Sequence, residues 1–202
     1  MSATVTVALT GASGMPYGLR LIESLIRAGS RVYLLYTQAA HVVAKQELGF
    51  VLPPNPSEAE RLFGERYSAK QGQLRVFGRE DWFAPVASGS NPPDAMVICP
   101  CTVGTLAAVA AGLSDNLIER AADVMLKESR KLILVPRETP FSSVHLENML
   151  KLSRAGAVIL PANPGFYYKP KRIEDLVDFI VARILDHLGV EHDLMQRWGE
   201  ER

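Results

Sequence analysis

The fold is decided near the N-terminus by Val5-Thr6-Val7-Ala8-Leu9 and the turn that follows it, Thr10-Gly11-Ala12-Ser13-Gly14. A near-continuous apolar run of this kind predicts a strand buried on both faces, as in a parallel sheet covered by helices. The next segment predicts a helix, because Pro16 suits a first helical turn and apolar residues recur along one face up to Ile26. A buried strand, a glycine-rich turn and an amphipathic helix in this order predict the start of a doubly wound α/β domain.

The same alternation of apolar runs and amphipathic segments continues along the chain. Further strands are predicted at 31–36, 95–99, 132–135 and 157–160, with a possible strand at 74–77. Further helices are predicted at 39–48, 102–111, 116–128, 142–155 and 173–188, and a capping box, Ser57-Glu58-Ala59-Glu60, predicts a short helix. We therefore expect a single doubly wound, mostly parallel sheet of the Rossmann or flavodoxin type over residues 1–189, followed by a C-terminal tail at 190–202.

Composition and charge narrow the class of protein. The 202 residues, 48% of them hydrophobic and 22% charged, are typical of a globular domain with its own core. The 22 basic and 22 acidic side chains cancel, which argues against a nucleic-acid binder. No apolar run approaches the ~18 residues that a membrane helix needs, and the N-terminus lacks a signal-peptide pattern. We expect a cytoplasmic protein that binds neither nucleic acid nor membrane.

Cysteine and histidine do not predict a metal or redox site. Cys99 and Cys101 are separated by a single residue, which fits neither a zinc knuckle nor a redox Cys-x-x-Cys motif. The four histidines are dispersed and share no ligand spacing. We expect no metal, and we expect both cysteines to pack in the core, with contact to a ligand as the alternative for Cys101.

Ligands of doubly wound sheets bind beyond the carboxyl ends of the strands, so the turns after the strands are candidate sites. The turn Gly11-Ala12-Ser13-Gly14 presents backbone amides at a helix N-terminus, where the helix dipole favours phosphate. It is neither a Gly-x-Gly-x-x-Gly fingerprint nor a Walker loop, and Tyr36-Thr37-Gln38 puts no acid after the second strand. FMN therefore fits better than NAD or ATP, while a turn without a ligand stays open for this motif alone.

Other segments have both a functional and a structural interpretation. Thr102-Val103-Gly104-Thr105 opens a small-residue helix, which fits an anion or flavin-edge site or close helix–sheet packing. Ser88-Gly89-Ser90 is rich in hydrogen-bonding groups, although a plain loop is the better interpretation of this motif alone. Arg137-Glu138 stands between Pro136 and Pro140, so a stiff backbone aims both side chains.

Three further cations stand in apolar surroundings. Arg120 and Lys127 belong to a predicted helix that is mostly apolar, which weakens the usual interpretation of solvated charges. Arg183 interrupts the apolar stretch 179–185, so its guanidinium either snorkels to water or pairs with an anion.

Taken together, these segments resemble the flavin prenyltransferase (UbiX) family. The matching segments are Thr10-Gly11-Ala12-Ser13-Gly14 with Tyr17-Gly18, Ala87-Ser88-Gly89-Ser90, Pro100-Cys101, Glu119-Arg120-Ala121-Ala122-Asp123-Val124 with Leu126-Lys127-Glu128, Pro136-Arg137-Glu138-Thr139-Pro140, Gly165-Phe166-Tyr167 and Arg197-Trp198-Gly199. The resemblance covers nearly the whole chain, and the order of the motifs makes it more specific than any single motif.

The resemblance implies an enzyme that joins a dimethylallyl group from dimethylallyl phosphate to N5 and C6 of reduced FMN without a metal. Its product, prenylated FMN, would pass to a partner decarboxylase of the UbiD family, some of which serve ubiquinone synthesis. The family has a Rossmann- or flavodoxin-like fold and assembles as a homododecamer with active sites at subunit contacts. The tail at 190–202 is then expected to pack near the active site or a neighbouring subunit.

The resemblance also implies roles for individual residues. The FMN-binding residues would be Gly11, Ala12, Ser13, Thr37, Ser88, Ser90, Thr102, Val103, Gly104, Thr105 and Arg137. The prenyl phosphate would meet Lys127, Arg120, Tyr167 and Arg183, and the catalytic residues would be Ser13, Glu47 and Glu138. Two positions depart from the family pattern, because Thr37 stands for the usual serine and Gln38 for the usual lysine.

Two other functions stay open from the sequence. A flavin-dependent peptidyl-cysteine decarboxylase has a related fold, but it uses a histidine base early in the chain, and His41 is poorly placed for that role. A non-enzymatic FMN-binding protein is the alternative from another class. The cluster of basic residues favours prenyl transfer over the decarboxylase.

Overall fold

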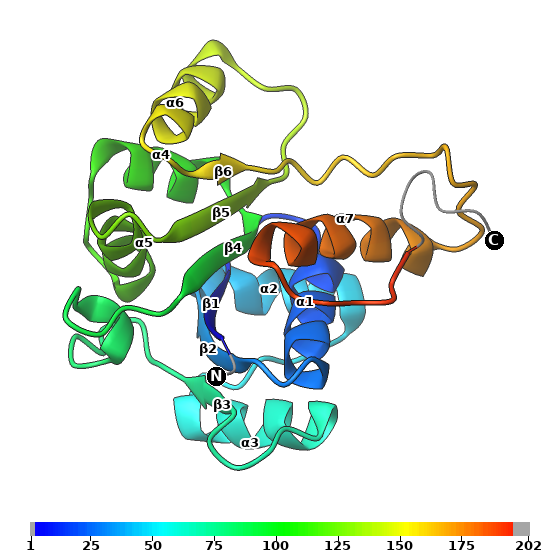
Figure 1. Ribbon diagram of the computed structural model, residues 1–202, viewed down its shortest axis with the longest axis horizontal. Coiled ribbons are helices and arrows are strands. Elements are labelled where there is room, and N and C mark those ends of the chain that lie inside the picture. Colours follow the sequence, from blue (N-terminus) through cyan, green and yellow to red (C-terminus); the bar gives the residue numbers. More distant parts are fainter. Residues whose placement is uncertain (1–2, 196–202) are drawn as a thin grey trace.

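The computed structural model describes residues 3–195, which form one sheet between two layers of helices (Figure 1). The sheet has six strands in the order β3-β2-β1-β4-β5-β6, and every neighbouring pair is parallel. The strands are β1 (Thr4–Leu9), β2 (Arg31–Tyr36), β3 (Leu74–Val76), β4 (Ala95–Cys101), β5 (Lys131–Pro136) and β6 (Val158–Ile159). This is the strand order of a Rossmann-type sheet, so the predicted doubly wound fold is confirmed.

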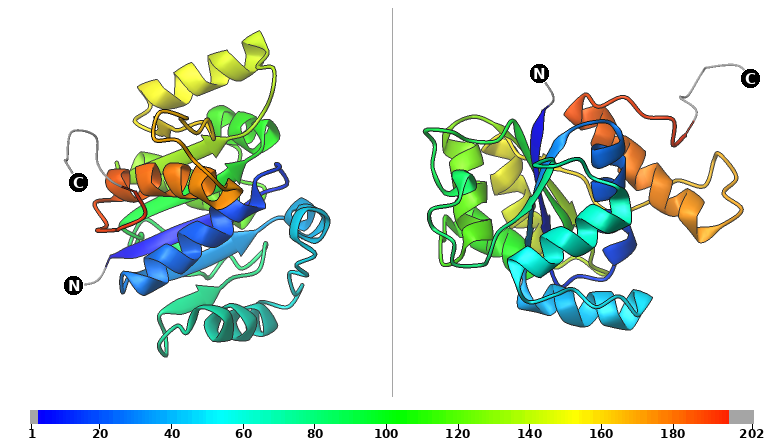
Figure 2. Two further views of the ribbon diagram at one scale, coloured as in Figure 1. Left: turned by 90° about the vertical axis from the view of Figure 1, so that its right-hand side faces the viewer. Right: turned by 90° about the horizontal axis from the view of Figure 1, so that it is seen from below.

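Helices cover both faces of the sheet (Figure 2). They are α1 (Met15–Arg27), α2 (Gln38–Leu48), α3 (Pro56–Tyr67), α4 (Val103–Ala111), α5 (Leu117–Lys127), α6 (Ser143–Arg154) and α7 (Ile173–Leu188), with a short 3-10 helix at Pro85–Ala87. Apolar side chains of α1, α2, α3 and α7 form the core on one face, and those of α4, α5 and α6 form the core on the other. Strand side chains divide between the two cores because successive residues point to opposite faces, as Val7 and Ala8 do.

The start of α3 differs from the sequence prediction. The capping box predicted at Ser57 is wrong, because the side chain of Asn55 caps the helix by accepting from the backbone N–H groups of Ser57 and Glu58. Glu60 instead accepts a hydrogen bond from the backbone N–H of Val76 in β3, at 3.1 Å. Glu60 therefore joins α3 to the edge strand, a contact between residues 16 positions apart that local patterns do not encode.

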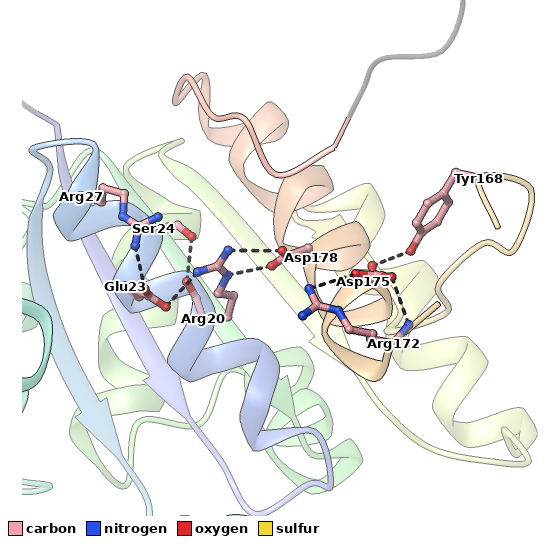
Figure 3. A network of polar contacts seen from close by, with 8 residues as sticks. All are labelled: Arg20, Glu23, Ser24, Arg27, Tyr168, Arg172, Asp175 and Asp178. Atoms are coloured by element: carbon pink, nitrogen blue, oxygen red, sulfur yellow. Dashed lines mark hydrogen bonds and ion pairs between the residues drawn. The ribbon is translucent and has the colours of Figure 1, made fainter. Parts of the chain in front are cut away.

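An ion-pair network anchors α7 to α1 (Figure 3). Arg20 of α1 donates from Nε and Nη2 to the two carboxylate oxygens of Asp178 of α7, at 2.7 and 3.2 Å. Arg20 also pairs with Glu23 at 3.0 Å. The hydrogen bond with Asp178 raises the pKa of Arg20 above its ordinary value, so this guanidinium stays charged. The two-point contact holds α7, together with the loop at 160–172 that precedes it, against the first helix.

Because all six strands are parallel, their N-terminal ends lie along one side of the sheet and their C-terminal ends lie along the opposite side. We call these two sides the start edge and the tip edge. Helix α7 runs back to the start edge, where Lys131 at the beginning of β5 donates from Nζ to the carbonyl of His187. Beyond α7, Leu194 and Met195 pack against the core on the α1 face. The rest of the predicted tail, including Arg197-Trp198-Gly199, lies outside the described residues.

The hydroxyl of Thr10 ties the tips of β1 and β4 together. It donates to the carbonyl of Pro100 at 2.7 Å and accepts from the backbone N–H of Thr102 at 2.9 Å, and the side chain is fully buried. The backbone N–H of Thr10 also donates to Pro100, at 3.2 Å. One buried hydroxyl thus sets the spacing of the two turns that follow these strands, at the point where the strand order reverses.

Replacing Thr10 with valine keeps the shape of the side chain and removes both of its hydrogen bonds. The Pro100 carbonyl keeps the backbone N–H of Thr10 as a donor, but the backbone N–H of Thr102 loses its partner, which should cost about 1–3 kcal/mol. In a chain of this size, such a loss lowers the midpoint of thermal unfolding by about 2–10 °C. Circular dichroism measures that midpoint, and Thr10→Ser, which keeps the hydroxyl, is the matched control. Equal midpoints for the valine and serine variants would contradict this role.

Candidate active site

The first turn of the site packs tightly between β1 and α1. A Cβ on Gly11 would lie 2.4 Å from the Cβ of Ala39 at the start of α2, so only glycine fits this position. Gly14 has a φ of 115°, a left-handed conformation that side chains disfavour. These two glycines let the chain turn sharply at the tip edge and keep Ala12 and Ser13 between two helix N-termini.

Glu47, predicted from the resemblance as a catalytic residue, caps the N-terminus of α1. Its two carboxylate oxygens accept from the backbone N–H of Gly14 at 3.0 and 3.1 Å, and one of them accepts from Met15 at 2.9 Å. A negative charge is stabilised here because the helix dipole is positive at this end. The sequence interpretation gave these amides to a ligand phosphate, which would have to compete with Glu47 for them.

Two more helix N-termini open at the tip edge. Thr37 caps α2 by accepting from the backbone N–H of Ala40 at 3.2 Å. Thr102 caps α4, because its hydroxyl accepts from the backbone N–H of Thr105 at 3.0 Å and donates to the Thr105 hydroxyl at 2.9 Å. The first turn of α4, with Val103 and Gly104, therefore combines backbone amides with two hydroxyls, which is a donor set suited to phosphate.

Arg137 links the turn after β5 to the turn after β1. Its Nε donates to the backbone carbonyl of Ser13 at 3.2 Å, although β4 lies between the two strands. The next residue, Glu138, is half-buried and accepts from the backbone N–H of Thr139 at 3.1 Å. The structure thus gathers one group at the tip edge, which we call the tip cluster: Gly11, Ala12, Ser13, Thr37, Glu47, Thr102, Val103, Gly104, Thr105, Arg137 and Glu138.

The predicted cations of α5, Arg120 and Lys127, form a second group with the loop Ser88-Gly89-Ser90, which we call the serine loop. Arg120 donates from Nε to the carbonyl of Ala87 at 3.0 Å, and Lys127 pairs with Glu128. A Cβ on Gly89 would lie 2.0 Å from Oε1 of Glu128 and 2.7 Å from Nζ of Lys127, so the loop runs directly over this ion pair. We call Ser88, Ser90, Arg120 and Lys127 the α5 cluster.

Lys127 of the α5 cluster lies at the start edge of the sheet. Lys127 ends α5 and stands four residues before Lys131, the first residue of β5. The serine loop likewise precedes Ala95, the first residue of β4, which pairs with Lys131. Lys127 and the tip cluster are therefore separated by the length of the strands within one chain.

Arg183 belongs to α7, and Tyr167 packs against the same helix. Arg183 pairs with Asp186 at 2.8 Å, and its side chain is 50% exposed, one turn before the start-edge contact of His187. Tyr167 belongs to the loop before α7 and packs against Phe179 with ring centroids 5.8 Å apart. Phe179 precedes Arg183 by four residues of α7, a rise of about 6 Å, so Tyr167 contacts this helix one turn before Arg183.

The cysteines do not take part in the site. Cys99 and Cys101 are fully buried, and burial raises the pKa of Cys101 to about 12, so its thiol is neutral near pH 7. The prediction that both cysteines pack is confirmed. Within residues 3–195, no three His, Cys, Asp or Glu side chains gather as a metal site requires, and no helix of that range is long and apolar enough to cross a membrane.

Two contacts of the site escaped the sequence analysis. The bridging role of Thr10 was missed, although a hydroxyl residue directly between a buried strand and a glycine turn is a signal for it. The pairing of Lys127 with Glu128 was missed as well, although the two residues are adjacent. The partners of Thr10 lie 90 and 92 residues away in the sequence, so only the fold identifies them.

The class of the protein follows from its match to a family model. Residues 1–185 match the model described as Flavoprotein, so the chain is a flavoprotein. It is 58% identical to the flavin prenyltransferase UbiX of Pseudomonas aeruginosa, over 98% of this chain and 94% of that protein. It is 49% identical to the flavin prenyltransferase UbiX of Halalkalibacterium halodurans, over the same shares. The chain belongs to the UbiX flavin prenyltransferase family, as its motifs predicted.

Solved structures agree with this assignment. The crystal structure of AnUbiX in complex with FMN and dimethylallyl pyrophosphate is 40% identical, with a TM-score of 0.87 over 100% of both chains. A dodecameric FMN-dependent UbiX-like decarboxylase from Escherichia coli O157:H7 is 37% identical, with a TM-score of 0.84 over 98% of this chain and 100% of that one. The FMN-dependent cysteine decarboxylase TvaF is 22% identical, with a TM-score of 0.56 over 79% of this chain and 90% of that one, and shares the fold alone.

The capping role of Glu47 can be measured at the amides that it holds. Glu47→Gln removes the charge, and hydrogen bonds to a charged partner are worth about 1.5–3 kcal/mol each. We expect the amides of Gly14 and Met15 to exchange with deuterium faster in this variant, as followed by mass spectrometry of the peptide that covers them. Glu65→Gln, which removes an exposed ion pair with Arg61, is the matched control. Unchanged exchange at the start of α1 would refute the cap.

Proposed function

We propose that the protein transfers a dimethylallyl group from dimethylallyl phosphate to N5 and C6 of reduced FMN and releases prenylated FMN. The observation that carries the proposal is the contact of Arg137 with Ser13, which puts a fixed cation beside three helix N-termini at one edge of the sheet. Membership of the flavin prenyltransferase family supports the same reaction.

The tip cluster has the groups that FMN requires. The amides at the start of α4, with the hydroxyls of Thr102 and Thr105, suit the FMN phosphate. Arg137 can pair with the electron-rich edge of the flavin. When bound, reduced FMN supplies the nucleophilic N5 and C6 positions. Thr37, which replaces the usual serine of the family, keeps the hydroxyl of that position.

A second copy of the chain is needed to complete this site. Breaking the C–O bond of an allyl phosphate leaves negative charge on the phosphate oxygens, which fixed cations stabilise in a dry pocket. Lys127 and Arg183 are the candidate cations, but within one chain they lie toward the start edge, away from the tip cluster. We propose that neighbouring copies in a homododecamer supply Ser88, Ser90, Arg120, Lys127 and Arg183 to the tip cluster, and that the tail at 190–202 packs near this contact. The dodecameric structural neighbour supports such an assembly.

Acid–base chemistry at the tip cluster is assigned to Glu138, with Ser13 as a hydroxyl donor to the phosphate. Closing the second bond at C6 requires loss of the C6 proton, and Glu138 or the departing phosphate accepts it. Glu47 is less suited to proton transfer, because both of its oxygens hold backbone amides. We assign Tyr167 to the prenyl phosphate on its match to the family motif.

The proposal extends to the fate of the product. A modified flavin that leaves the site needs an apoenzyme to receive it, and we propose a UbiD-type decarboxylase in the cytoplasm, with ubiquinone synthesis among the pathways served. The donor is proposed to be the monophosphate. The complex of AnUbiX contains the pyrophosphate, so the assay of the donor has to compare both.

The proposed reaction is tested by mass spectrometry of the flavin. We expect the purified protein, supplied anaerobically with reduced FMN and dimethylallyl phosphate, to convert FMN into a product heavier by one five-carbon prenyl unit. The pyrophosphate is the parallel donor. A protein that binds FMN and forms no such product with either donor would instead be a flavin-binding protein of another function.

Mixed assemblies test whether two copies share one site. Arg137→Ala removes a tip-cluster cation, Lys127→Ala removes an α5-cluster cation, and each variant alone should be nearly inactive. Random co-assembly of equal amounts joins an intact tip cluster to an intact α5 cluster at about a quarter of the contacts, so about a quarter of the wild-type rate should return. The double variant co-assembled with itself is the inactive control. A mixture as inactive as its components would mean that each site lies within one chain.

A further inference from the structure

The ring of Tyr167 rests on a group of residues that have no role in the reaction so far. It meets the ring of Phe179 in α7 edge-on, with centroids 5.8 Å apart and planes at 76°. It meets the ring of Tyr168 in the same way, at 6.0 Å and 76°. Tyr168 and Phe179 are themselves stacked at 5.3 Å, with planes only 11° apart. Two parallel rings thus form a wall against which Tyr167 stands.

Gly165 forms the floor beneath the same ring. A Cβ at this position would lie 2.7 Å from Cε1 and 3.1 Å from Cδ1 of Tyr167, and 3.2 Å from Cζ of Phe179. Gly165 is not among the described glycines that have a positive φ, so the backbone conformation alone does not require glycine here. The ring of Tyr167 requires it, because a methyl group would occupy its place.

The wall is anchored to the rest of the fold. The hydroxyl of Tyr168 donates to the backbone carbonyl of Asp175 in the first turn of α7 (Figure 3). The carboxylate of Asp175 accepts from the backbone N–H groups of Lys171 and Arg172 at 2.8 and 3.1 Å, which secures the end of the loop. One turn further along α7, Asp178 binds Arg20 of α1. The loop that carries Tyr167 is therefore fixed relative to α1, which begins just after Ser13 of the tip cluster.

Such a support is needed because Tyr167 is not held by burial. Its side chain is on the surface of the chain, and the residue is 58% exposed. An exposed ring on a loop has several rotamers, and its hydroxyl is aimed at a substrate only if neighbouring groups restrict them. Gly165, Tyr168 and Phe179, which we call the aromatic seat, provide that restriction.

We propose that Gly165 is a positioning residue for prenyl transfer, and that the aromatic seat holds the Tyr167 hydroxyl where it meets the phosphate of the prenyl donor. The inference rests on the proposed function, which assigns the phosphate contact to Tyr167. It adds that the glycine of Gly165-Phe166-Tyr167 is required by the ring two residues later. It also separates the two substrates, since the seat acts on the prenyl donor and leaves FMN binding to the tip cluster.

The test is Gly165→Ala, which changes no group that touches a substrate. The added methyl group displaces the Tyr167 ring, and a displacement of about 1 Å in a positioned group costs up to about a hundredfold in rate. We expect kcat/KM for dimethylallyl phosphate to fall about ten- to a hundredfold, with a higher KM for this donor, while the Kd of FMN stays within about twofold. Gly64→Ala in α3, where a Cβ would have no neighbour within 4 Å, is the matched control and should behave as wild type.

Two further variants separate the possible results. Tyr167→Phe removes the hydroxyl and sets the largest loss that the seat can cause, and Tyr168→Leu removes one ring of the wall if Gly165→Ala does not fold. Donor-specific losses in Gly165→Ala or Tyr168→Leu, close to that of Tyr167→Phe, support the seat. Wild-type kcat/KM in both seat variants, beside a slow Tyr167→Phe, overturns the inference and leaves the proposed function standing. A wild-type protein that forms no prenylated FMN overturns both.

Discussion

The site depends on one buried hydroxyl, that of Thr10, which joins the end of β1 to the end of β4. These two strands flank the point where the order of the sheet reverses, and their turns lead into α1 and α4. A difference in their spacing would separate the amides of the α4 N-terminus from Ser13 and from Arg137, which reaches Ser13 across β4. A single satisfied polar group in the core therefore sets the geometry of a surface site.

The N-termini of α1 and α4 differ in what their amides bind. Glu47 neutralises the N-terminus of α1 from within the chain, whereas the N-terminus of α4 presents its amides beside two threonine hydroxyls. Because of this difference, the N-terminus of α4 is the better place for a ligand phosphate, and the first glycine-rich turn serves as a closely packed side of the site. Several other basic groups pair with acids of their own helix, as Arg120 does with Asp123 and Arg183 with Asp186.

The outcome for the predicted site residues shows how far local patterns reach. Each turn after a strand was found because a buried apolar run and a following glycine, threonine or arginine are neighbours in the chain. The tip cluster then follows from the parallel order of the strands, which sends every such turn to one edge. The α5 cluster could not be assigned to an edge in this way, since Lys127 is the last residue of a helix and its position depends on how α5 packs.

The order of strands and helices, the parallel sheet and the chemical character of its turns were determined by the sequence alone, because hydrophobic period and turn residues act over a few positions. Only the tertiary structure decided that the Glu47 carboxylate accepts from the amides of Gly14 and Met15. It also decided that the Glu60 side chain bonds to the backbone of Val76 in β3, and that the ring of Tyr167 lies over Gly165. The first two of these contacts join side chains to backbone groups 16 to 33 residues away, and the third depends on the packing of α7 against α1. Such contacts depend on how whole helices pack against the sheet, which no local pattern records.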